Sequence, residues 1–354
     1  MMADGDRDGG YFTSAPRPTG MTELGKVDRS FFEAVVRPNL GAEREDVALG
    51  PTHGVDFGVL DVGGRALVTA TDPVSILPEL GFERAGRLAV DIVLADVAVS
   101  GVPPTHLAVS LSLPPEMTDD ELAATWRGMA GHCEDLGVSV VTGHTARYSG
   151  IDYSWVGGAT GFGVGSFDEL VRPDGARPGD ALVVSTGPAA EVAGLFSTLF
   201  GDRLGLPEST LETARERLDD IEAVRDARTA FEAGEVTAMH DATEGGVVGG
   251  LVEMAAGVRF DVERAKMPLA PGVEAVCEAV GVDPWLVTSC GTLLVTVDPD
   301  DADAVVAALE SRGTPAAVVG GVTAGEGVYV DGERVTAPDG DPSWAAAETL
   351  SEKG

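Results

Sequence analysis

Segments typical of strands and of helices alternate in both halves of this chain, on either side of a stretch rich in proline and glycine, ELVRPDGARPGDALVVSTGP at 169–188. β-Branched residues with apolar–polar alternation predict strands, and apolar residues at helical spacing predict helices. In the first half the predicted strands are 66–72, 105–113, 138–143 and 155–165, and the predicted helices are 87–101 and 119–137. In the second half the strands are 180–186, 258–265, 291–297 and those within 314–336, and the helices are 190–200, 208–232, 246–256, 271–280 and 300–312. This mixture predicts an α+β fold in two halves.

The proline and glycine cluster marks a boundary between two domains, because these residues interrupt regular structure. We expect an N-terminal domain over 26–168 and a C-terminal α+β domain over 176–340. The segment 1–25 is rich in Gly, Asp and Pro and is expected to be disordered, and residues 341–354 are expected to form a tail.

The chain is strongly acidic, with 58 Asp and Glu against 24 Lys and Arg and a net charge of −34. Such a charge repels nucleic acid at ordinary salt. The hydrophobic content of 44% and the regular apolar segments argue against a disordered acidic chain. We therefore expect a folded protein of a high-salt cytoplasm, where a Debye length of about 3 Å at 1 M salt screens self-repulsion, and we expect low salt to destabilise it.

Membrane and secreted classes are not indicated. No apolar run reaches the roughly 20 residues of a membrane-spanning helix, and the acidic N-terminus lacks a secretory pattern. The cysteines Cys133, Cys277 and Cys290 are far apart and odd in number, which fits neither a CxxC zinc site nor a disulfide framework and suggests a reducing compartment. Cys290 could be reactive, but a buried structural thiol is the favoured interpretation.

The stretch MHDATEGGVVGGLVEMA at 239–255 combines carboxylates with four glycines before an apolar run. Asp241 and Glu244 have the spacing of a helix N-cap and its partner in a capping box, which leaves the glycines unexplained. Gly245 and Gly246 would open the helix, where free N–H groups favour an anion and the missing Cβ lets a ligand approach. Carboxylates beside a phosphate require a hard cation such as Mg²⁺. The stretch therefore predicts a magnesium–phosphate site.

The stretch TATDPVS at 69–75 follows an apolar strand and contains Asp72. An aspartate at the end of a strand is well placed to hold a cation. An ordinary Asp-Pro turn explains the same residues equally well, so this stretch alone leaves both interpretations open.

Two aspartates, Asp91 and Asp96, interrupt the otherwise apolar predicted helix 87–101. Five residues turn a helix by about 140° beyond one full turn, so both cannot lie on one solvent-facing stripe. A carboxylate in such a helix needs a partner. We assign Asp91 to a structural ion pair with Arg84 or Arg87, and Asp96 to function.

The stretch GMTELGKV at 20–27 nearly matches a phosphate-binding P-loop. Val27 replaces the hydroxyl that would bind magnesium, and no strand precedes the stretch, so coincidence is the favoured explanation. Lys26 could still contact a phosphate as a lone cation.

The stretch VVTGHTARYSG at 140–150 places Gly143, His144 and Thr145 after a predicted strand. Their backbone amides, imidazole and hydroxyl could meet phosphate oxygens. A structural role is the alternative for a single histidine in this position.

Taken in order, these motifs resemble the aminoimidazole ribonucleotide synthetase superfamily, which includes thiamine-monophosphate kinase, selenophosphate synthetase and the hydrogenase-maturation protein HypE. The archaeal HypE-like branch is the most similar, over about 20–336. The matching stretches are GVDFGVLD, TATDPVS, ADVAVSGVPP, TGHTARY, HDATEGG and TSCGTLL. Ala95 stands where the family has Asn, and Phe57-Gly58 replace an Ala pair. The C-terminal SWAAAETLSEKG lacks the terminal cysteine of HypE.

The resemblance implies a PurM-like fold of two α+β domains, with the N-terminal domains of two subunits pairing into a barrel-like homodimer. It implies MgATP as cofactor and metal ligation by Asp56, Asp72, Asp96 and Asp241. The further nucleotide-binding residues would be Lys26, Gly143, Thr145, Gly245 and Gly246, and the catalytic residues would be Asp241, Glu244 and His144.

The resemblance also implies phosphoryl transfer to an acceptor, or ATP-driven activation of an amide-type oxygen. Alternatives are a thiamine-monophosphate-kinase-like enzyme, a nucleotide-binding maturation or scaffold protein without turnover, and a degenerate member that only dimerises. The sequence does not identify the acceptor, which could be a small molecule or a protein group.

Overall fold

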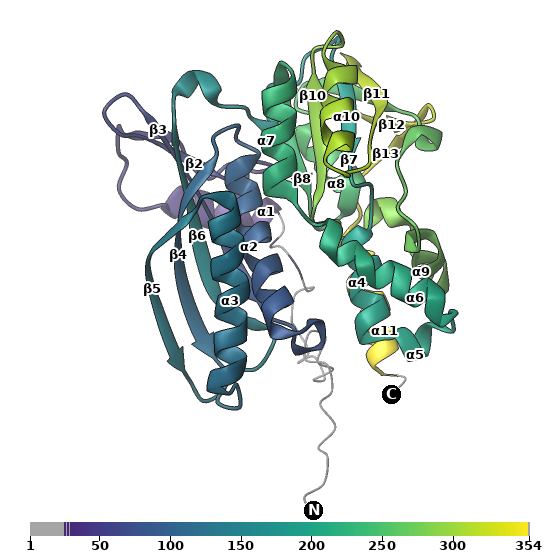
Figure 1. Ribbon diagram of the computed structural model, residues 1–354. Helices are drawn as coiled ribbons and strands as arrows, with labels where there is room; N and C mark the ends of the chain where they lie inside the picture. Colours follow the sequence, from purple (N-terminus) through teal and green to yellow (C-terminus); the bar gives the residue numbers. More distant parts are fainter. Residues whose placement is uncertain (1–24, 26, 28, 353–354) are drawn as a thin grey trace, which may run out of the picture.

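The computed structural model describes residues 25, 27 and 29–352 and forms two halves, each built on a sheet covered by helices (Figure 1). This arrangement confirms the predicted α+β fold in two halves. Of the segment 1–25 that was expected to be disordered, only Gly25 is among the described residues. Lys26 also lies outside them.

The N-terminal sheet has the strand order β1-β2-β3-β6-β4-β5. Its strands are β1 Val47–Leu49, β2 Gly58–Asp61, β3 Ala66–Ser75, β4 Pro104–Leu113, β5 Ser139–Arg147 and β6 Trp155–Gly165. Among these described strands, only the β4–β5 pair is parallel. The short α1 (Arg29–Phe31) precedes the sheet, and α2 (Phe82–Ala98) and α3 (Asp119–Leu136) lie side by side across one face (Figure 1). The predicted strands and helices of this half are confirmed.

The contact between α2 and α3 brings the two backbones close together. A Cβ on Gly128 would lie only 1.8 Å from the carbonyl oxygen of Glu83, so a side chain at this position would push the helices apart. Helix α3 begins with a capping box, in which Thr118 N–H donates to the Glu121 carboxylate at 2.8 Å and Glu121 N–H donates to the Thr118 hydroxyl at 3.2 Å. These local signals fix the helical layer over the sheet.

The C-terminal sheet has the order β13-β12-β9-β11-β7-β10-β8. Its strands are β7 Ala181–Ser185, β8 Val236–Ala242, β9 Val258–Val262, β10 Thr292–Val297, β11 Ala316–Ala324, β12 Gly327–Val330 and β13 Glu333–Val335. Helices α7 (Ala223–Ala233) and α10 (Ala302–Ser311) cover one face, and α8 (Gly246–Met254) packs on the other. Strand β8 is not among the predicted strands, although it carries part of the acidic, glycine-rich stretch.

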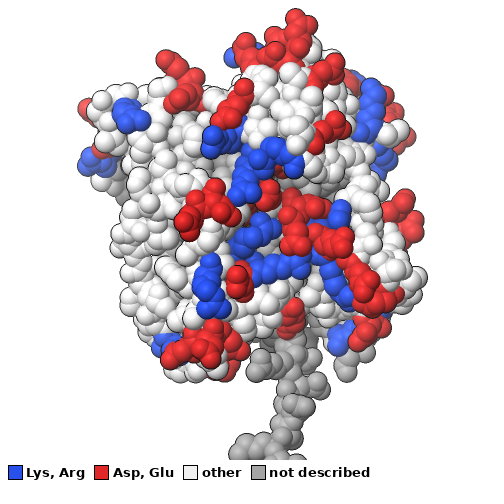
Figure 2. All heavy atoms as spheres, viewed as in Figure 1, with Lys and Arg blue, Asp and Glu red and all other residues white. Residues whose placement is uncertain are grey.

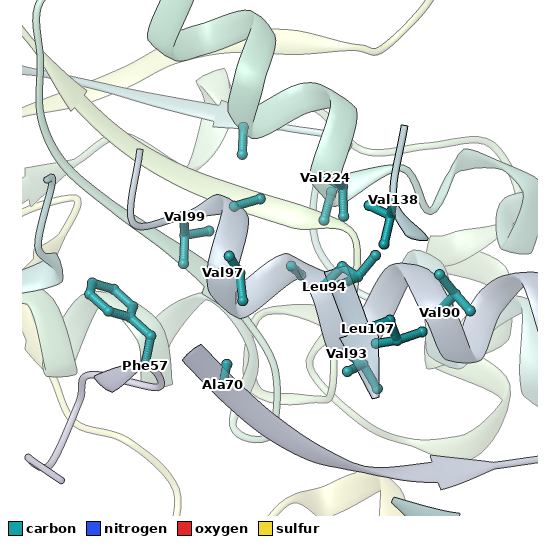
Figure 3. Close-up of a cluster of buried hydrophobic side chains, with 14 of the residues drawn as sticks. Phe57, Ala70, Val90, Val93, Leu94, Val97, Val99, Leu107, Val138 and Val224 are labelled. Atoms are coloured by element: carbon teal, nitrogen blue, oxygen red, sulfur yellow. The ribbon is translucent and has the colours of Figure 1, made fainter. Parts of the chain in front are cut away.

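One apolar core runs between the two halves. Leu94 and Val97 of α2 share a buried cluster with Val224 of α7 (Figure 3). Val295 of β10 belongs to the same cluster. Because α2 meets its own sheet on one side and the second half on the other, most of its residues are buried. The core therefore holds the two halves against each other.

A further group of helices packs around its own core beside the second sheet. It consists of α4 Ala190–Leu199, α5 Gly201–Leu204, α6 Glu208–Arg215, α9 Val273–Val280 and α11 Pro342–Ser351. Helix α11 falls in the segment expected to be a tail, yet Ala347 and Leu350 are buried in this core. No helix in the described part of the chain is long and apolar enough to cross a membrane.

The prediction of one helix over 208–232 is wrong, because the chain breaks after α6 into a 3-10 segment, Glu216–Asp220 (η7), before α7. The break frees backbone carbonyl groups. Arg87 of the N-terminal half donates to the carbonyl oxygens of Leu218 at 3.2 Å and Ile221 at 3.4 Å. A charged donor from the other half thus satisfies acceptors that a continuous helix would use internally.

Ion pairs reinforce the same seam between the halves. Arg84 lies 2.9 Å from Asp219, and Asp135 lies 3.6 Å from Arg225. Figure 2 shows a group of positive side chains near the centre of this face with acidic ones around it, and further positive side chains toward its upper left and right. Arg84 and Arg225 thus pair with acids of the opposite half at the seam.

Candidate active site between the two halves

A cavity of about 280 Å³ lies between the two halves and is lined by residues from both. One end of it is acidic, with Asp56, Asp72 and Asp96 from the N-terminal half and Glu244 from the C-terminal half. These residues come from a loop, a strand, a helix and the β8–α8 connection. The structure therefore brings together four residues that the sequence assigned to one site.

Asp72 lies within β3, opposite Ala159 of β6, and not in a turn. The Asp-Pro turn interpretation is therefore wrong. Alternation along a strand sends successive side chains to opposite faces. The position in β3 places Asp72 at the cavity instead of at a loop tip.

Asp96 lies in the last turns of α2 and is only 6% exposed. Burial, followed by the negative charges of Asp241, Asp72 and Asp56, raises the pKa of Asp96 well above its usual range. Burial among other acids therefore favours the protonated form of this carboxyl. The functional assignment of Asp96 fits this environment.

Asp91, one and a half turns earlier in the same helix, faces away from this group. Its carboxylate lies 2.8 Å from Nε2 of His132 on α3, and both side chains are buried. The structural pair predicted for Asp91 exists, but its partner is His132 and not Arg84 or Arg87. Those arginines bind carbonyl groups and Asp219 in the second half.

Asp56, His240 and Asp241 form a tight group across the two halves. Nδ1 of His240 lies 3.6 Å from Asp241 and 3.7 Å from Asp56, and the ligand atoms of all three lie within 4.8 Å of one another. Nδ1 of His240 and Oδ1 of Asp241 are buried and have no hydrogen-bond partner among the described residues. Buried polar atoms without partners are costly. The arrangement therefore fits a bound divalent cation, for which carboxylate oxygens are typical ligands.

His240 is a member of this group that the sequence interpretation did not name as a site residue, although it directly precedes Asp241 in the motif. Its Nε2 lies 2.8 Å from the Glu253 carboxylate of α8. Burial by itself lowers the pKa of His240, but the carboxylates of Asp241, Glu253 and Asp56 outweigh burial and raise this pKa to about 10. Without a metal ion, His240 thus supplies a positive charge inside the acidic group.

The capping-box interpretation of Asp241 and Glu244 is wrong. Asp241 lies in β8, opposite Leu293 of β10, and the residue that caps α8 is Gly245, with φ of 79°. A Cβ on Gly246 would lie 2.6 Å from the carbonyl oxygen of Val287. The glycines are therefore required by a left-handed backbone and by close packing against the 285–287 segment.

The predicted phosphate site at the start of α8 also needs correction. The Gly245 N–H donates to the Asp341 carboxylate at 2.9 Å, and the Gly246 N–H donates to the Thr243 carbonyl at 2.9 Å. Both amides are thus already bonded within the chain. Asp341 caps α11 and anchors it beside the cavity, where Ser343 and Trp344 form part of the wall.

Gly143, His144 and Thr145 lie in β5, at the edge of the N-terminal sheet, and do not line the cavity. His144 is exposed, and its Nε2 lies 2.9 Å from the Tyr148 hydroxyl. A Cβ on Gly143 would lie 2.4 Å from the Val109 carbonyl oxygen, which accounts for the glycine by packing. Within one chain, these residues are not brought to the acidic group.

A second polar group lines the cavity on the side of the C-terminal half. The Glu191 carboxylate of α4 accepts hydrogen bonds from the Thr288 hydroxyl at 2.9 Å and the Cys290 N–H at 3.0 Å. Burial and the neighbouring Glu191 raise the pKa of the Cys290 thiol well above its usual range, so this cysteine stays protonated. Cys290 lines the cavity but lacks the thiolate of a reactive cysteine.

Family models match both halves of the chain. The N-terminal domain of AIR synthase related protein matches residues 54–163, and the C-terminal domain of AIR synthase related protein matches residues 177–333. The carbamoyl dehydratase HypE of Escherichia coli (strain K12) is 30% identical to this chain over 316 residues, which cover 86% of this chain and 89% of that protein.

Solved structures show the same fold. The crystal structure of E. coli HypE, a hydrogenase maturation protein, matches with a TM-score of 0.65 at 27% identity and covers 78% of this chain and 87% of that one. The structure of AaThiL complexed with AMPPCP and TMP matches with a TM-score of 0.70 at 23% identity, covering 91% and 99% of the two chains. The second similarity concerns the fold alone.

Proposed function

This chain belongs to the family of AIR synthase related proteins, in its HypE-like branch, and we propose that it is an ATP-dependent enzyme that activates an amide-type oxygen of an acceptor bound in the cavity. Membership confirms the resemblance that the motifs predicted. The E. coli relative is named a carbamoyl dehydratase, and ATP-driven attack on an amide oxygen is the chemistry that we carry over from it.

The observation that carries the proposal is the convergence of acids from both halves on one cavity. Burial and the nearby negative charges of Asp241, Asp72 and Asp56 raise the pKa of Asp96. Carboxylates from both halves that face one cavity, two of them buried, are a favourable site for a divalent cation. We therefore propose that Asp56, Asp72, Asp96 and Asp241 hold Mg²⁺ together with the phosphates of ATP.

Bound Mg²⁺ would polarise the phosphoryl group and neutralise its developing charge. The remaining tasks fall to the chain's own residues. His240, held by Glu253, keeps Asp56 and Asp241 oriented across the two halves. The apolar walls exclude water that would otherwise compete with the acceptor for the phosphoryl group. Glu244, at the cavity, can accept a proton from the acceptor nitrogen.

We propose a homodimer formed through the N-terminal sheets. Val140 and Val141 of the edge strand β5 are exposed, by 37% and 56%, although both are apolar. An edge strand with exposed apolar residues favours pairing with another chain. A second copy over this face would cover them and enclose Gly143, His144 and Thr145 at the subunit interface.

The alternative of a thiamine-monophosphate-kinase-like enzyme is not favoured. None of the described residues that line the cavity is Lys, Arg or His, so the described part of the cavity offers no cation to a phosphorylated acceptor. With Mg²⁺ and the phosphates of ATP at the acidic end, a phosphorylated acceptor would need a further cation elsewhere in the cavity.

ADP release in molar KCl with Mg²⁺ and ATP tests the proposal against the scaffold alternative. Asp72→Asn and Asp241→Asn should each weaken Mg-dependent ATP binding at least about tenfold while the fold is kept. Asp120→Asn, an exposed position on α3, is the matched control and should bind ATP like the unmodified chain. Unchanged ATP titrations for both cavity variants would reject the site. ATP binding without ADP release, with and without primary amides present, would favour the scaffold.

A further inference from the structure

Strand β8 brings two donor atoms to one point between the halves. His240 and Asp241 are consecutive, so their side chains leave opposite faces of the strand. Because β8 is the edge strand of the C-terminal sheet, the two side chains can meet around its edge. Nδ1 of His240 thus lies 3.6 Å from the Asp241 carboxylate and 3.7 Å from the carboxylate of Asp56 in the N-terminal half.

These two distances are too long for hydrogen bonds and suit an ion between the atoms. An N–H group that donates to a carboxylate lies about 2.7–2.9 Å from the oxygen. Two atoms bound to one ion at about 2.1 Å lie roughly 3.4 Å apart at the tetrahedral angle and about 4.2 Å apart on opposite sides of the ion. The separations from Nδ1 fall within this interval, and the ligand atoms of Asp56, His240 and Asp241 all lie within 4.8 Å of one another.

Burial distinguishes this group from acidic side chains on the surface. His240 is 1% exposed and Asp241 is 4% exposed. Nδ1 of His240 and Oδ1 of Asp241 have no hydrogen-bond partner within the described part of the chain. Water solvates a carboxylate at the surface, whereas buried polar atoms need a partner in the protein or a ligand. Two such atoms therefore face the same point.

The other ring nitrogen of His240 determines what Nδ1 can offer. Nε2 lies 2.8 Å from the Glu253 carboxylate of α8, so Nε2 carries a hydrogen and donates it to Glu253. Nδ1 can then present its lone pair to an ion, which takes the place of the proton that Nδ1 carries in the metal-free protein. Histidines that bind metal ions usually donate their second N–H to a carboxylate or a carbonyl group in this way.

Two glycines allow the close packing on which this geometry depends. A Cβ on Gly250 of α8 would lie 2.7 Å from Cδ1 of Leu294 in β10, so a side chain there would push the helix off the sheet. A Cβ on Gly54 would lie 3.1 Å from Cβ of Glu253. Glycine at these positions lets α8 lie close to the sheet and lets the loop that carries Asp56 lie against α8.

We propose that Asp56, His240 and Asp241 hold a divalent first-row transition metal ion through Nδ1 and two carboxylate oxygens, before any nucleotide binds. The affinity of a site with a nitrogen ligand rises from Mn²⁺ to Co²⁺, whereas Mg²⁺ takes oxygen ligands. The inference rests on the proposed function for the MgATP that binds beside this ion, where Asp72 and Asp96 remain as ligands.

Pulsed EPR of Mn²⁺ bound to the nucleotide-free full chain in molar KCl tests the nitrogen ligand directly, because a coordinated imidazole adds nitrogen-14 hyperfine coupling to the spectrum. The unmodified chain should show this coupling in the presence of excess Mg²⁺. His240→Gln, which offers an oxygen in place of the nitrogen, should lose the coupling. His106→Gln, at an exposed position of β4, is the control and should keep it. Mn²⁺ that does not bind, or that binds without this coupling in the unmodified chain, would overturn the inference.

Calorimetry without nucleotide measures the selectivity of the site. Co²⁺ should bind the unmodified chain at least about tenfold more tightly than Mg²⁺, and His240→Gln should bring the two affinities within about threefold of each other. Equal affinities of the unmodified chain for Co²⁺ and Mg²⁺ would contradict the inference.

Variants of Glu253 keep the inference testable if His240→Gln does not fold, because this side chain is 28% exposed. Glu253→Ala removes the acceptor of the Nε2 hydrogen and should weaken Co²⁺ binding at least about tenfold. Glu253→Gln can still accept that hydrogen bond and should recover most of the affinity. Unchanged Co²⁺ affinity in a folded Glu253→Ala variant would show that His240 is not held as a metal ligand.

The outcomes for the metal ions and for ATP separate the two proposals. Mn²⁺ bound through nitrogen without any Mg-dependent ATP binding rejects the proposed function and leaves the metal site standing. ATP turnover with Mg²⁺ in a chain that binds no Mn²⁺ through nitrogen rejects this inference and leaves the proposed function standing.

Discussion

Replacing Asp96 by asparagine separates the charge of this carboxyl from its shape. Burial and the charges of Asp241, Asp72 and Asp56 raise the pKa of Asp96 well above its usual range, which favours the protonated carboxyl in the metal-free protein. Asparagine has nearly the same size and no charge. We therefore expect Asp96→Asn to change the free energy of unfolding by no more than about 1 kcal/mol at neutral pH.

The effect on nucleotide binding should be much larger. A carboxyl that holds a proton must release it to become a metal ligand, so MgATP binding should release up to one proton. Below the metal-free pKa of Asp96, affinity should therefore rise about tenfold for each unit of pH, since one pKa unit corresponds to about 1.4 kcal/mol. Asp96→Asn should lose at least about tenfold in affinity, together with this pH dependence.

Calorimetry in two buffers with different ionisation enthalpies measures both quantities, because the difference in heat gives the number of protons released. Asp226→Asn is the matched control: Asp226 is also buried, and burial raises its pKa to about 7, but it lies outside the cavity. The control should keep the affinity for MgATP and its proton release.

Two results would refute the reasoning. MgATP binding without proton release in the unmodified chain would show that Asp96 is not a protonated ligand waiting for a metal. Full affinity in Asp96→Asn would show that its carboxylate does not hold the metal ion at all.

Three further predictions concern stability. Gly246→Ala should lower the free energy of unfolding by about 3 kcal/mol or more, because it combines a left-handed backbone with overlap on the carbonyl oxygens of Val287 and Trp285. Its control is Gly257→Ala, which has φ of 80° and open space around the added Cβ and should cost only about 1–2 kcal/mol. Equal losses for the two variants in denaturant unfolding would contradict the packing argument. The folded pKa of Asp226 is raised from 3.8 to about 7, so the contribution of this carboxyl to stability is present below pH 3.8 and is lost as pH rises to 7. The free energy of unfolding should therefore decline by up to about 4 kcal/mol over this range in the unmodified chain, and Asp226→Asn should remove that decline. Parallel curves of unfolding free energy against pH for the variant and the unmodified chain would contradict this prediction. Lowering KCl from molar concentration to about 0.1 M should lower Tm, because the Debye length grows from about 3 to 10 Å and the acidic side chains behind the net charge of −34 repel one another more strongly. A Tm that is unchanged or higher would disprove the halophilic interpretation.

The sequence pattern predicted regular elements best where their signals are local. The strand at 66–72 and the helix at 119–137 correspond to β3 and α3, because alternation and capping depend on neighbouring residues. The helix predicted over 208–232 failed, because a distant arginine, Arg87, satisfies the carbonyls at its break. Strand β8 was hidden for the same reason: its pairing with β10 depends on residues some fifty positions away.

The sequence by itself determined which acids belong together. Only Asp96 was singled out by its apolar helix; an Asp-Pro turn for Asp72 and a capping box for Asp241 remained open, and the resemblance of the ordered motifs grouped these acids. The motif order then identified the family, since spacing along a chain is a property of the sequence alone.

Only the tertiary structure decided how these acids are surrounded. Glu191 meets Cys290 and Gly245 meets Asp341 across some hundred residues, and His240 lies between carboxylates of both halves. Such contacts depend on how two sheets and their helices pack, and no short-range pattern encodes them. Burial and the field of neighbouring charges, which set the pKa of Asp96 and the uncharged character of the cavity wall, exist only after that packing is complete.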